Sequence, residues 1–328
     1  MPRNKKKIGS SKNNKLKRKT IFNKRKRKIT KRKKQFKQFK QFKQYGGALQ
    51  IKDLAGAEVC KGVEEWNRLE MNTQADSVIT IGDYAFEGCR PLVSIAIPDL
   101  VTTIGDHAFS RCTELVSVTI NDTSKLAAIG DYAFWGCTSL TSITIPGLVT
   151  TIKFAAFSGC TDLASITILG SVTSIEDSAF SDCTSLASIT IPGSVTTIGK
   201  SAFNGCTKLA SITIPISVTT IGSFAFKGCS SLATITINDP SKLATIGNNA
   251  FKGCSSLATI TIPGSVTAIG YDAFVGCTSL RSIIMPKSIT HGYIVNPGDW
   301  KCGDKNTNKY VQMKGCINYD VVISNKIK

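Results

Sequence analysis

Nine cysteines recur at nearly constant intervals along the middle of the chain, and this repeat limits what the chain can fold into. The successive intervals are 23, 25, 23, 23, 23, 23, 25 and 23 residues. An Ala-Phe pair precedes each cysteine, with the Phe three residues before it, and a leucine stands three residues after it. A fixed period of about 20–50 residues is the signature of a solenoid, whose units bury their apolar side chains only against neighbouring units. The sequence therefore predicts about nine stacked coils, marked by Cys89, Cys112, Cys137, Cys160, Cys183, Cys206, Cys229, Cys254 and Cys277.

Each unit contains two segments of different character. Residues 187–191 alternate small or polar with β-branched apolar side chains and end at Pro192-Gly193, which is typical of a short strand buried on one side. Residues 198–206 are too short for a normal helix and predict a tight turn or a single helical turn. We therefore expect one strand and one irregular back side in each coil.

The unit can be written C-x-x-L-x-x-I-x-I-P-x-x-V-x-x-I-G-x-x-A-F-x-x, and nine copies fit it with minor substitutions between about Val78 and Ile289. This pattern resembles the BspA-like class of leucine-rich repeats. The resemblance implies a curved right-handed solenoid with a short parallel β-sheet on one face and turns or short helical turns on the other. Members of that class are commonly surface or secreted binding proteins of bacteria and protists, and similar repeats occur in large DNA viruses. The resemblance supplies no catalytic residue.

The regions that flank the repeats differ from them in composition. We expect residues 1–47 to form a disordered Lys/Arg-rich arm that ends in a Gly-Gly hinge, and residues 48–77 to form a partly helical N-terminal cap. The repeats then occupy residues 78–289. Residues 290–328 lack the repeat and are expected to form a C-terminal cap, in which Cys302 and Cys316 are candidates for a disulfide.

The basic charge of the chain belongs to the N-terminal arm. The net charge is +19, and residues 1–45 contain 21 of the 41 Lys and Arg residues and no Asp or Glu, which leaves 41 − 21 = 20 basic against 22 acidic residues elsewhere. Three interpretations stay open: a nuclear targeting signal, a nucleic-acid-binding tail with aromatic stacking, and a polybasic contact with an anionic membrane. The candidate residues are Lys24, Arg25, Lys26, Arg27, Lys28, Lys31, Arg32, Lys33, Lys34, Phe36, Phe39 and Phe42.

The location of the protein is predicted from what the chain lacks. The first 45 residues hold no apolar run long enough for a secretory signal, and no stretch of about 18 apolar residues predicts a transmembrane helix. We therefore expect an intracellular, nuclear or virion-associated protein rather than a secreted one.

The residues that could carry chemistry have simpler structural explanations. Cysteines at least 23 residues apart within the repeats lack the close pairs of a zinc site, so we expect buried, reduced thiols. The two histidines, His107 and His291, stand at unrelated repeat positions, and His107 is expected to be an exposed surface residue. Asp83, Asp106 and Asp131 recur on the back-side turn, where a capping or turn role is expected. The sequence predicts no enzyme, metal site, cofactor or small-molecule substrate.

The outward positions of the expected strands carry two ladders of hydroxyl side chains. The alternation points Ser and Thr away from the core with almost no charge among them. This pattern is compatible with a merely solvated face, with a face that binds a neutral protein or glycan, and with an ice-binding array. We expect a non-enzymatic interaction or scaffolding protein, the alternative being an adhesin-like surface protein exported without a classical signal. The candidate partner-binding residues are Ser142, Thr144, Ser165, Thr167, Ser188, Thr190, Ser211 and Thr213.

Overall fold

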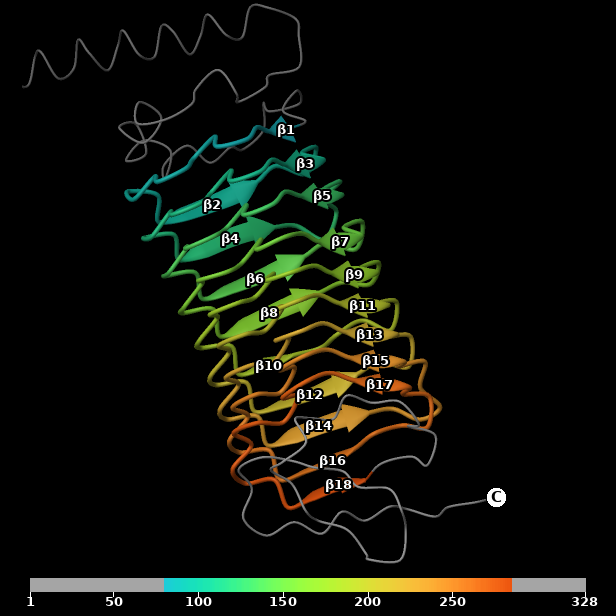
Figure 1. Cartoon of the computed structure of the whole chain (residues 1–328). Coiled ribbons are helices and arrows are strands. Elements are labelled where there is room, and N and C mark those ends of the chain that lie inside the picture. Colours follow the sequence, from blue (N-terminus) through green and yellow to red (C-terminus); the bar gives the residue numbers. More distant parts are fainter. Residues whose placement is uncertain (1–79, 285–328) are drawn as a thin grey trace, which may run out of the picture. The chain divides into compact units, whose positions relative to one another are not determined.

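The computed structural model describes residues 80–284, and these residues form nine stacked coils without a helix (Figure 1). One strand of each coil is usually four residues long and corresponds to the strand expected from the alternating segment. The even-numbered strands are β2 (Ser94–Ile97), β4 (Ser117–Ile120), β6 (Ser142–Ile145), β8 (Ser165–Ile168), β10 (Ser188–Ile189), β12 (Ser211–Ile214), β14 (Thr234–Ile237), β16 (Thr259–Thr261) and β18 (Ser282–Ile284).

A second, two-residue strand in each coil was not expected, so the prediction of one strand per coil is wrong. These strands precede the back-side turn, and each pairs with the equivalent strand of the next coil. They are β1 (Thr80–Ile81), β3 (Thr103–Ile104), β5 (Ala128–Ile129), β7 (Thr151–Ile152), β9 (Ser174–Ile175), β11 (Thr197–Ile198), β13 (Thr220–Ile221), β15 (Thr245–Ile246) and β17 (Ala268–Ile269). Stacking creates them, because a two-residue segment becomes a strand only when the next coil pairs with it.

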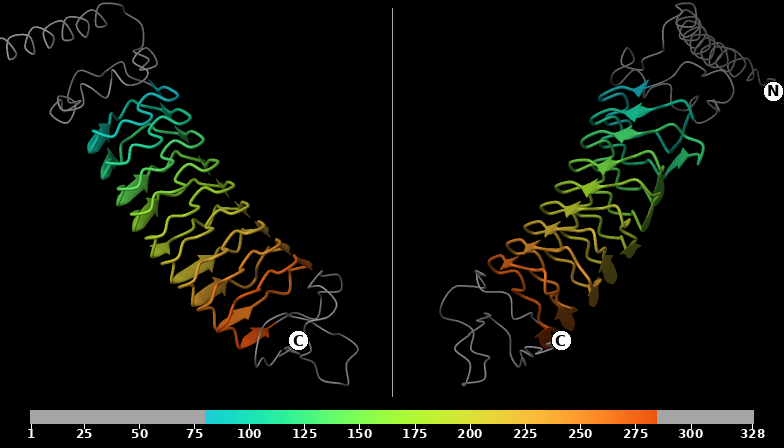
Figure 2. Two further views of the ribbon diagram at one scale, coloured as in Figure 1. Left: turned by 60° about the vertical axis from the view of Figure 1, so that its left-hand side comes forward. Right: turned by 90° about the vertical axis from the view of Figure 1, so that its right-hand side faces the viewer.

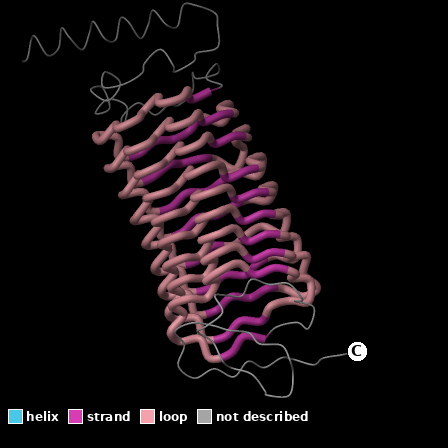
Figure 3. The backbone as a smooth tube through the Cα atoms, in the orientation of Figure 1, coloured by secondary structure: helices cyan, strands magenta, loops and turns pink. Residues whose placement is uncertain are grey.

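All strand pairs are parallel, and each joins equivalent repeat positions. The even strands form the sheets β10-β8-β6-β4-β2 and β12-β14-β16-β18, and the odd strands form β1-β3-β5 and β17-β15-β13-β11-β9-β7. In β6 and β8, for example, Ser142 pairs with Ser165 and Ile143 with Ile166. This register places each outward side chain next to the side chain at the equivalent position of the previous coil. The two series of strands run along the stack as separate columns (Figures 2 and 3).

The interior consists of ladders of identical apolar side chains. Eight of the nine repeat phenylalanines are almost fully buried, and their rings stack with centroids 5.0 Å apart for Phe86 and Phe109 and 5.5 Å apart for Phe157 and Phe180. Stacked rings at this separation add a favourable interaction to the burial of their area. The ladders explain why the Ala-Phe pair recurs in every coil.

The back-side turn uses left-handed backbone at two positions of each coil. The residue before Ala-Phe has a positive φ in every coil, although it is never glycine; Tyr84, His107 and Tyr132 have φ values of 57°, 54° and 55°. The residue before the cysteine is also left-handed and is usually glycine, except Arg111 and Asp182. The expectation was a tight turn or a single helical turn, and within residues 80–284 the segment is a tight turn, because left-handed residues break the α-helical path.

The proposed domain boundaries fall mostly outside the described residues. The arm of residues 1–47, the cap of residues 48–77 and the cap of residues 290–328 all lie outside residues 80–284, so these boundaries stay predictions. The described residues lie within the expected repeat region of 78–289.

Candidate binding face and its surroundings

The eight candidate hydroxyl residues lie on the outer side of consecutive coils. Seven of them are exposed and Thr144 is half-buried, while the isoleucines between them are buried. The parallel register places Ser142 next to Ser165 and Thr144 next to Thr167, so the expected ladders are formed. The same positions continue into neighbouring coils, from Ser117 and Thr119 of β4 to Thr259 and Thr261 of β16.

An exposed apolar column borders these ladders. It consists of the residue immediately before each even strand except Thr141 and Arg281, and its largest members, Val93 and Val116, are 46% and 40% exposed. Further along the stack the column narrows to exposed alanines, such as Ala187 and Ala210. We call this column and the two hydroxyl ladders together the hydroxyl face. The sequence interpretation missed the column because strict alternation does not extend into the turn before the strand.

Other hydroxyls of the repeat have a different, structural role. Two columns of Thr and Ser donate their side-chain hydroxyls to a backbone carbonyl of the preceding coil: Thr196 Oγ1 lies 3.1 Å from the carbonyl oxygen of Thr173, and Thr184 Oγ1 lies 3.2 Å from that of Thr161. These bonds fasten one coil to the next. None of the eight candidate hydroxyls makes such a bond within residues 80–284, so their hydrogen-bonding groups face solvent.

The aspartates of the back-side turn also connect neighbouring coils. Asp83 Oδ1 accepts a hydrogen bond of 2.9 Å from the backbone N–H of Asp106, and Asp106 Oδ1 accepts one of 2.8 Å from that of Asp131. Asp177 does the same for Lys200, and Asn248 replaces aspartate in the bond to Tyr271. The expected turn role of Asp83 and Asp106 is confirmed, with the addition that each bond crosses to the next coil.

His107 is part of a short aromatic stack on the back-side turns. Its ring lies parallel to the rings of Tyr84 and Tyr132, with centroids 4.8 Å and 4.6 Å away. The prediction that His107 is an exposed surface residue is therefore wrong, because stacking leaves it half-buried. The rings cover one another's faces, so the stack presents edges to solvent. His291 lies outside the described residues.

The repeat cysteines form a buried ladder of hydrogen-bonded thiols. Cys112, Cys137, Cys160, Cys183, Cys206, Cys229, Cys254 and Cys277 are buried and free. Each donates its S–H to the carbonyl oxygen of a phenylalanine in an earlier coil; for Cys183 and Phe157 the distance is 3.1 Å. Burial raises the pKa of Cys160 and of Cys229 to about 12. A thiol held neutral in this way is a poor nucleophile and a poor metal ligand.

Cys89 differs from the other repeat cysteines because it is disulfide-bonded. The expectation of reduced thiols is therefore wrong for the first coil and confirmed for the other eight. None of the eight free cysteines is its partner.

The described residues contain no cluster of side chains suited to a metal ion. Within residues 80–284 no group of three or more His, Cys, Asp or Glu side chains is arranged to hold a metal ion. No helix in the same range could cross a membrane. The arm candidates, from Lys24 to Phe42, lie outside the described residues, and their role stays a prediction.

The comparisons with known proteins agree with this architecture. The family model for the BspA type leucine rich repeat region matches six copies over residues 65–187 and 173–293, which together make up more than half of the chain. The chain belongs to the BspA-type leucine-rich repeat family. Within the matched range, the repeated Ile, Phe, Cys and Leu of this chain build the interior ladders. Membership therefore accounts for the fold of this BspA-type protein and leaves its exposed positions to be interpreted separately.

Several solved structures are similar to this BspA-type protein. A leucine rich cell surface protein from Faecalibacterium prausnitzii is 30% identical over 65% of this chain and 78% of that chain, with a TM-score of 0.35. The T. pallidum leucine rich repeat protein is 27% identical over 62% and 72% of the two chains, with a TM-score of 0.38. The pneumococcal vaccine antigen PcpA is 22% identical over 65% and 69%, with a TM-score of 0.37. The search of curated proteins gave no match.

Proposed function

We propose that this BspA-type protein is a non-enzymatic binding protein whose hydroxyl face docks on a neutral protein or glycan surface. One observation carries the proposal: the repeat uses some hydroxyls to fasten coils together and leaves the hydroxyls of this face without a partner among the described residues. Solvent-facing hydroxyls can both donate and accept hydrogen bonds, so they suit a polar, uncharged surface. The neighbouring Val93 and Val116 add apolar area that docking would bury.

In this proposal the basic arm determines where the protein acts. Its Lys and Arg residues would bind an import receptor or phosphate groups, and Phe36, Phe39 and Phe42 would stack on exposed bases. The folded repeats and the arm then have separate tasks, with recognition on the repeats and localisation on the arm. Such a division suits a scaffolding protein in the nucleus or in a nucleic-acid-containing particle.

The test of the hydroxyl face is site-specific photo-crosslinking in the source cells. A photoreactive amino acid at Ser188 would lie in the middle of the face, and one at Lys242 would lie on a turn outside it. We expect one specific adduct from position 188 that is missing at position 242. Adducts only from position 242, or identical adducts from both positions, would refute the assignment of the face.

A second candidate function is an adhesin-like protein that acts outside the cell. The disulfide at Cys89 favours this alternative, because structural disulfides persist in oxidising compartments. Mass spectrometry of the protein isolated from its source under thiol-blocking conditions distinguishes the two. Oxidised Cys89 in an extracellular fraction supports the adhesin-like function. Cys89 that carries the thiol-blocking reagent, in a nuclear or particle fraction, supports the function inside the cell.

A further inference from the structure

The back-side turns carry charged side chains, whereas the hydroxyl face has almost none. Each turn is the seven-residue segment that starts two residues before the left-handed position of its coil, and we number the coils 1 to 9 along the chain. The segments are residues 82–88, 105–111, 130–136, 153–159, 176–182, 199–205, 222–228, 247–253 and 270–276. Together they form one side of the stack, which we call the back-turn wall. In Figure 1 the chain returns along this wall from each odd strand to the next even strand.

The net charge of the wall changes sign along the stack. With histidine neutral, the segments of coils 1 to 9 carry −2, 0, −1, +1, −3, +1, +1, +1 and −1. Coil 1 contributes Asp83 and Glu87, and coil 5 contributes Glu176, Asp177 and Asp182. The positive coils 4, 6, 7 and 8 contribute Lys153, Lys200, Lys227 and Lys252. All of these side chains are exposed or half-buried, so an approaching molecule meets their charges.

This order of charges is self-complementary in one antiparallel register. If a two-fold axis passes between coils 4 and 5, coil 1 faces coil 8 of the second copy, and the facing charges are −2 and +1. Coils 2 and 7 then bring 0 against +1, coils 3 and 6 bring −1 against +1, and coils 4 and 5 bring +1 against −3. No facing pair has two charges of the same sign. An isologous contact of this kind closes at two copies.

The neighbouring registers place like charges together. With the axis on coil 5, its −3 faces itself and coil 1 faces coil 9, −2 against −1. With the axis on coil 4, its +1 faces itself and coil 3 faces coil 5, −1 against −3. In a parallel arrangement every coil faces its own copy. Like charges opposite one another disfavour all three of these alternatives. An axis between coils 3 and 4 also avoids like charges but joins six coils of each copy, so the register that joins eight has the larger contact.

We propose that two copies of this protein associate through their back-turn walls, antiparallel and with the axis between coils 4 and 5. Eight coils at a strand spacing of about 4.8 Å give a contact about 38 Å long, and a width of about 15 Å gives about 1,100 Å² over both copies. This area is at the lower limit of specific interfaces, so the dimer is weak and depends on charge. The even strands lie outside the wall, so both hydroxyl faces stay open in the dimer, which gives bivalent binding.

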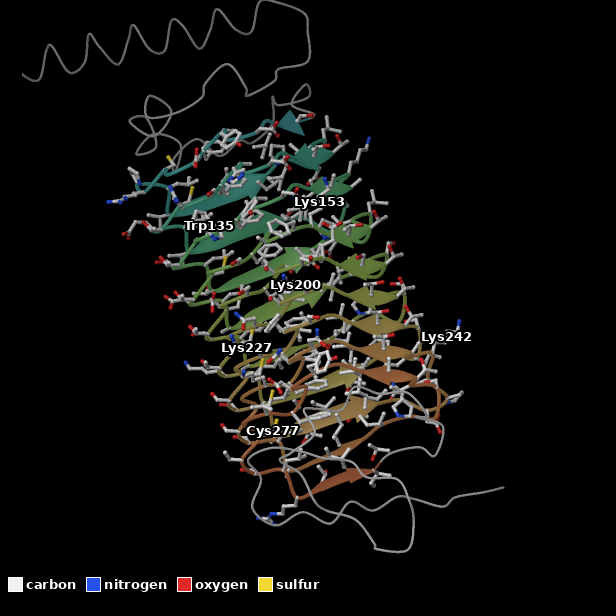
Figure 4. All side chains as sticks on the ribbon, in the orientation of Figure 1. Trp135, Lys153, Lys200, Lys227, Lys242 and Cys277 are labelled. Carbon is white, nitrogen blue, oxygen red and sulfur yellow. The ribbon has the colours of Figure 1, made fainter. Side chains whose placement is uncertain are left out.

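Two double variants with matching charge changes test the register. Lys200→Glu/Lys252→Glu makes coils 6 and 8 negative, and Glu87→Lys/Asp131→Lys makes coil 1 neutral and coil 3 positive. In the proposed register coil 1 faces coil 8 and coil 3 faces coil 6, so each variant repels its own copies. In a mixture of the two, coil 3 of each chain again faces a coil 6 of opposite charge, and coil 1 of the Lys200→Glu/Lys252→Glu chain again faces a positive coil 8. The control, Lys208→Glu/Lys242→Glu, makes the same change of charge at two exposed lysines outside the wall; Figure 4 labels Lys242 at the edge of the stack, away from Lys227.

The measurement is sedimentation equilibrium of the nuclease-treated full-length chain, at concentrations up to about 100 µM and salt of about 50 and 500 mM. We expect a reversible dimer at low salt that dissociates at high salt for the wild type and the control. Each wall variant alone should be monomeric, because its dimer dissociation constant rises at least about tenfold. An equimolar mixture of the two variants should form a one-to-one heterodimer. Circular dichroism checks that each variant is folded.

Three results would overturn the proposal. A wild-type chain that stays monomeric at low salt and high concentration has no such interface. Wall variants that dimerise as well as the wild type would place the contact elsewhere, and so would a mixture that fails to recover. Oligomers that keep growing with concentration would show an open, head-to-tail contact instead of a closed dimer.

Discussion

At the scale of single residues, the cysteine of each coil acts as a small buried side chain with one directed hydrogen bond. Burial raises the pKa of Cys160 and Cys229 from 9.0 to about 12, so the fold stabilises the neutral thiol. A raised folded pKa contributes stability that is complete below the unfolded value and is lost as the pH rises toward the folded value. The relevant window is therefore from pH 9 to about pH 12.

The first prediction concerns this alkaline window. The free energy of unfolding should fall above pH 9, with each buried thiol contributing a slope of up to about 1.4 kcal/mol per pH unit. Urea unfolding of the wild type and of Cys160→Ala/Cys229→Ala at several pH values measures the slopes. The double variant should be less stable at pH 7 and lose less stability on going to alkaline pH. Equal slopes for the two proteins would contradict the assignment.

The second prediction separates backbone conformation from packing. Gly159 has a φ of +73° and an added Cβ would meet only ordinary contacts, so Gly159→Ala should destabilise by about 1 kcal/mol through backbone strain alone. Gly193 has open space around it and no positive φ, so Gly193→Ala is the matched control and should change stability little. Thermal unfolding measures both. Equal melting temperatures would show that left-handed backbone is not required at Gly159.

At the scale of the structural element, the turn aspartate joins each coil to the next. Asp177 Oδ1 lies 2.7 Å from the backbone nitrogen of Lys200, and coil 8 makes the equivalent bond with Asn248. The third prediction is that Asp177→Ala costs about 1 kcal/mol of stability, whereas Asp177→Asn keeps most of it, because an amide oxygen also accepts this bond. Chemical denaturation compares the two. An Asn variant as unstable as the Ala variant would mean that the negative charge matters more than the hydrogen bond.

The even strands and the odd strands show what sequence reasoning can predict at this scale. Residues 187–191 alternate and end at Pro192-Gly193, so the strand that includes Ser188 and Ile189 was predictable from local pattern. Thr197 and Ile198 form a strand only because Thr220 and Ile221 of the next coil pair with them. The environment of His107 was missed for a similar reason, since Tyr84 and Tyr132 are its neighbours in space and stand about one repeat away in sequence.

At the scale of the whole molecule, the charge of the arm and the neutrality of the hydroxyl face predict two independent activities. The positions of the candidate face were predictable because equivalent residues of successive coils pair with each other, Ser142 with Ser165 and Ser165 with Ser188. Its apolar border at Val93 and Val116 was not, because those residues precede the alternating strand.

The fourth prediction concerns the arm. The full-length protein should bind generic DNA and RNA with an affinity that falls steeply between about 50 and 200 mM salt, because each phosphate contact releases a counterion. A chain that begins at Ala48 should lose this binding. Fluorescence anisotropy with a short labelled duplex and a single strand measures both chains. Binding that survives the truncation would place the nucleic-acid contact on the repeats.

The fifth prediction tests the claim that the hydroxyl face is the recognition surface. The measurement is the dissociation constant of the cross-linked partner, purified and titrated calorimetrically against three proteins: the wild type, Ser165→Lys/Ser188→Lys and the control Lys208→Glu/Lys242→Glu. The account predicts at least about a tenfold loss of affinity for the double serine variant, because a docked neutral surface would have to desolvate two charges, and no change for the control. Unchanged affinity of the double serine variant, with its fold intact, would contradict the account.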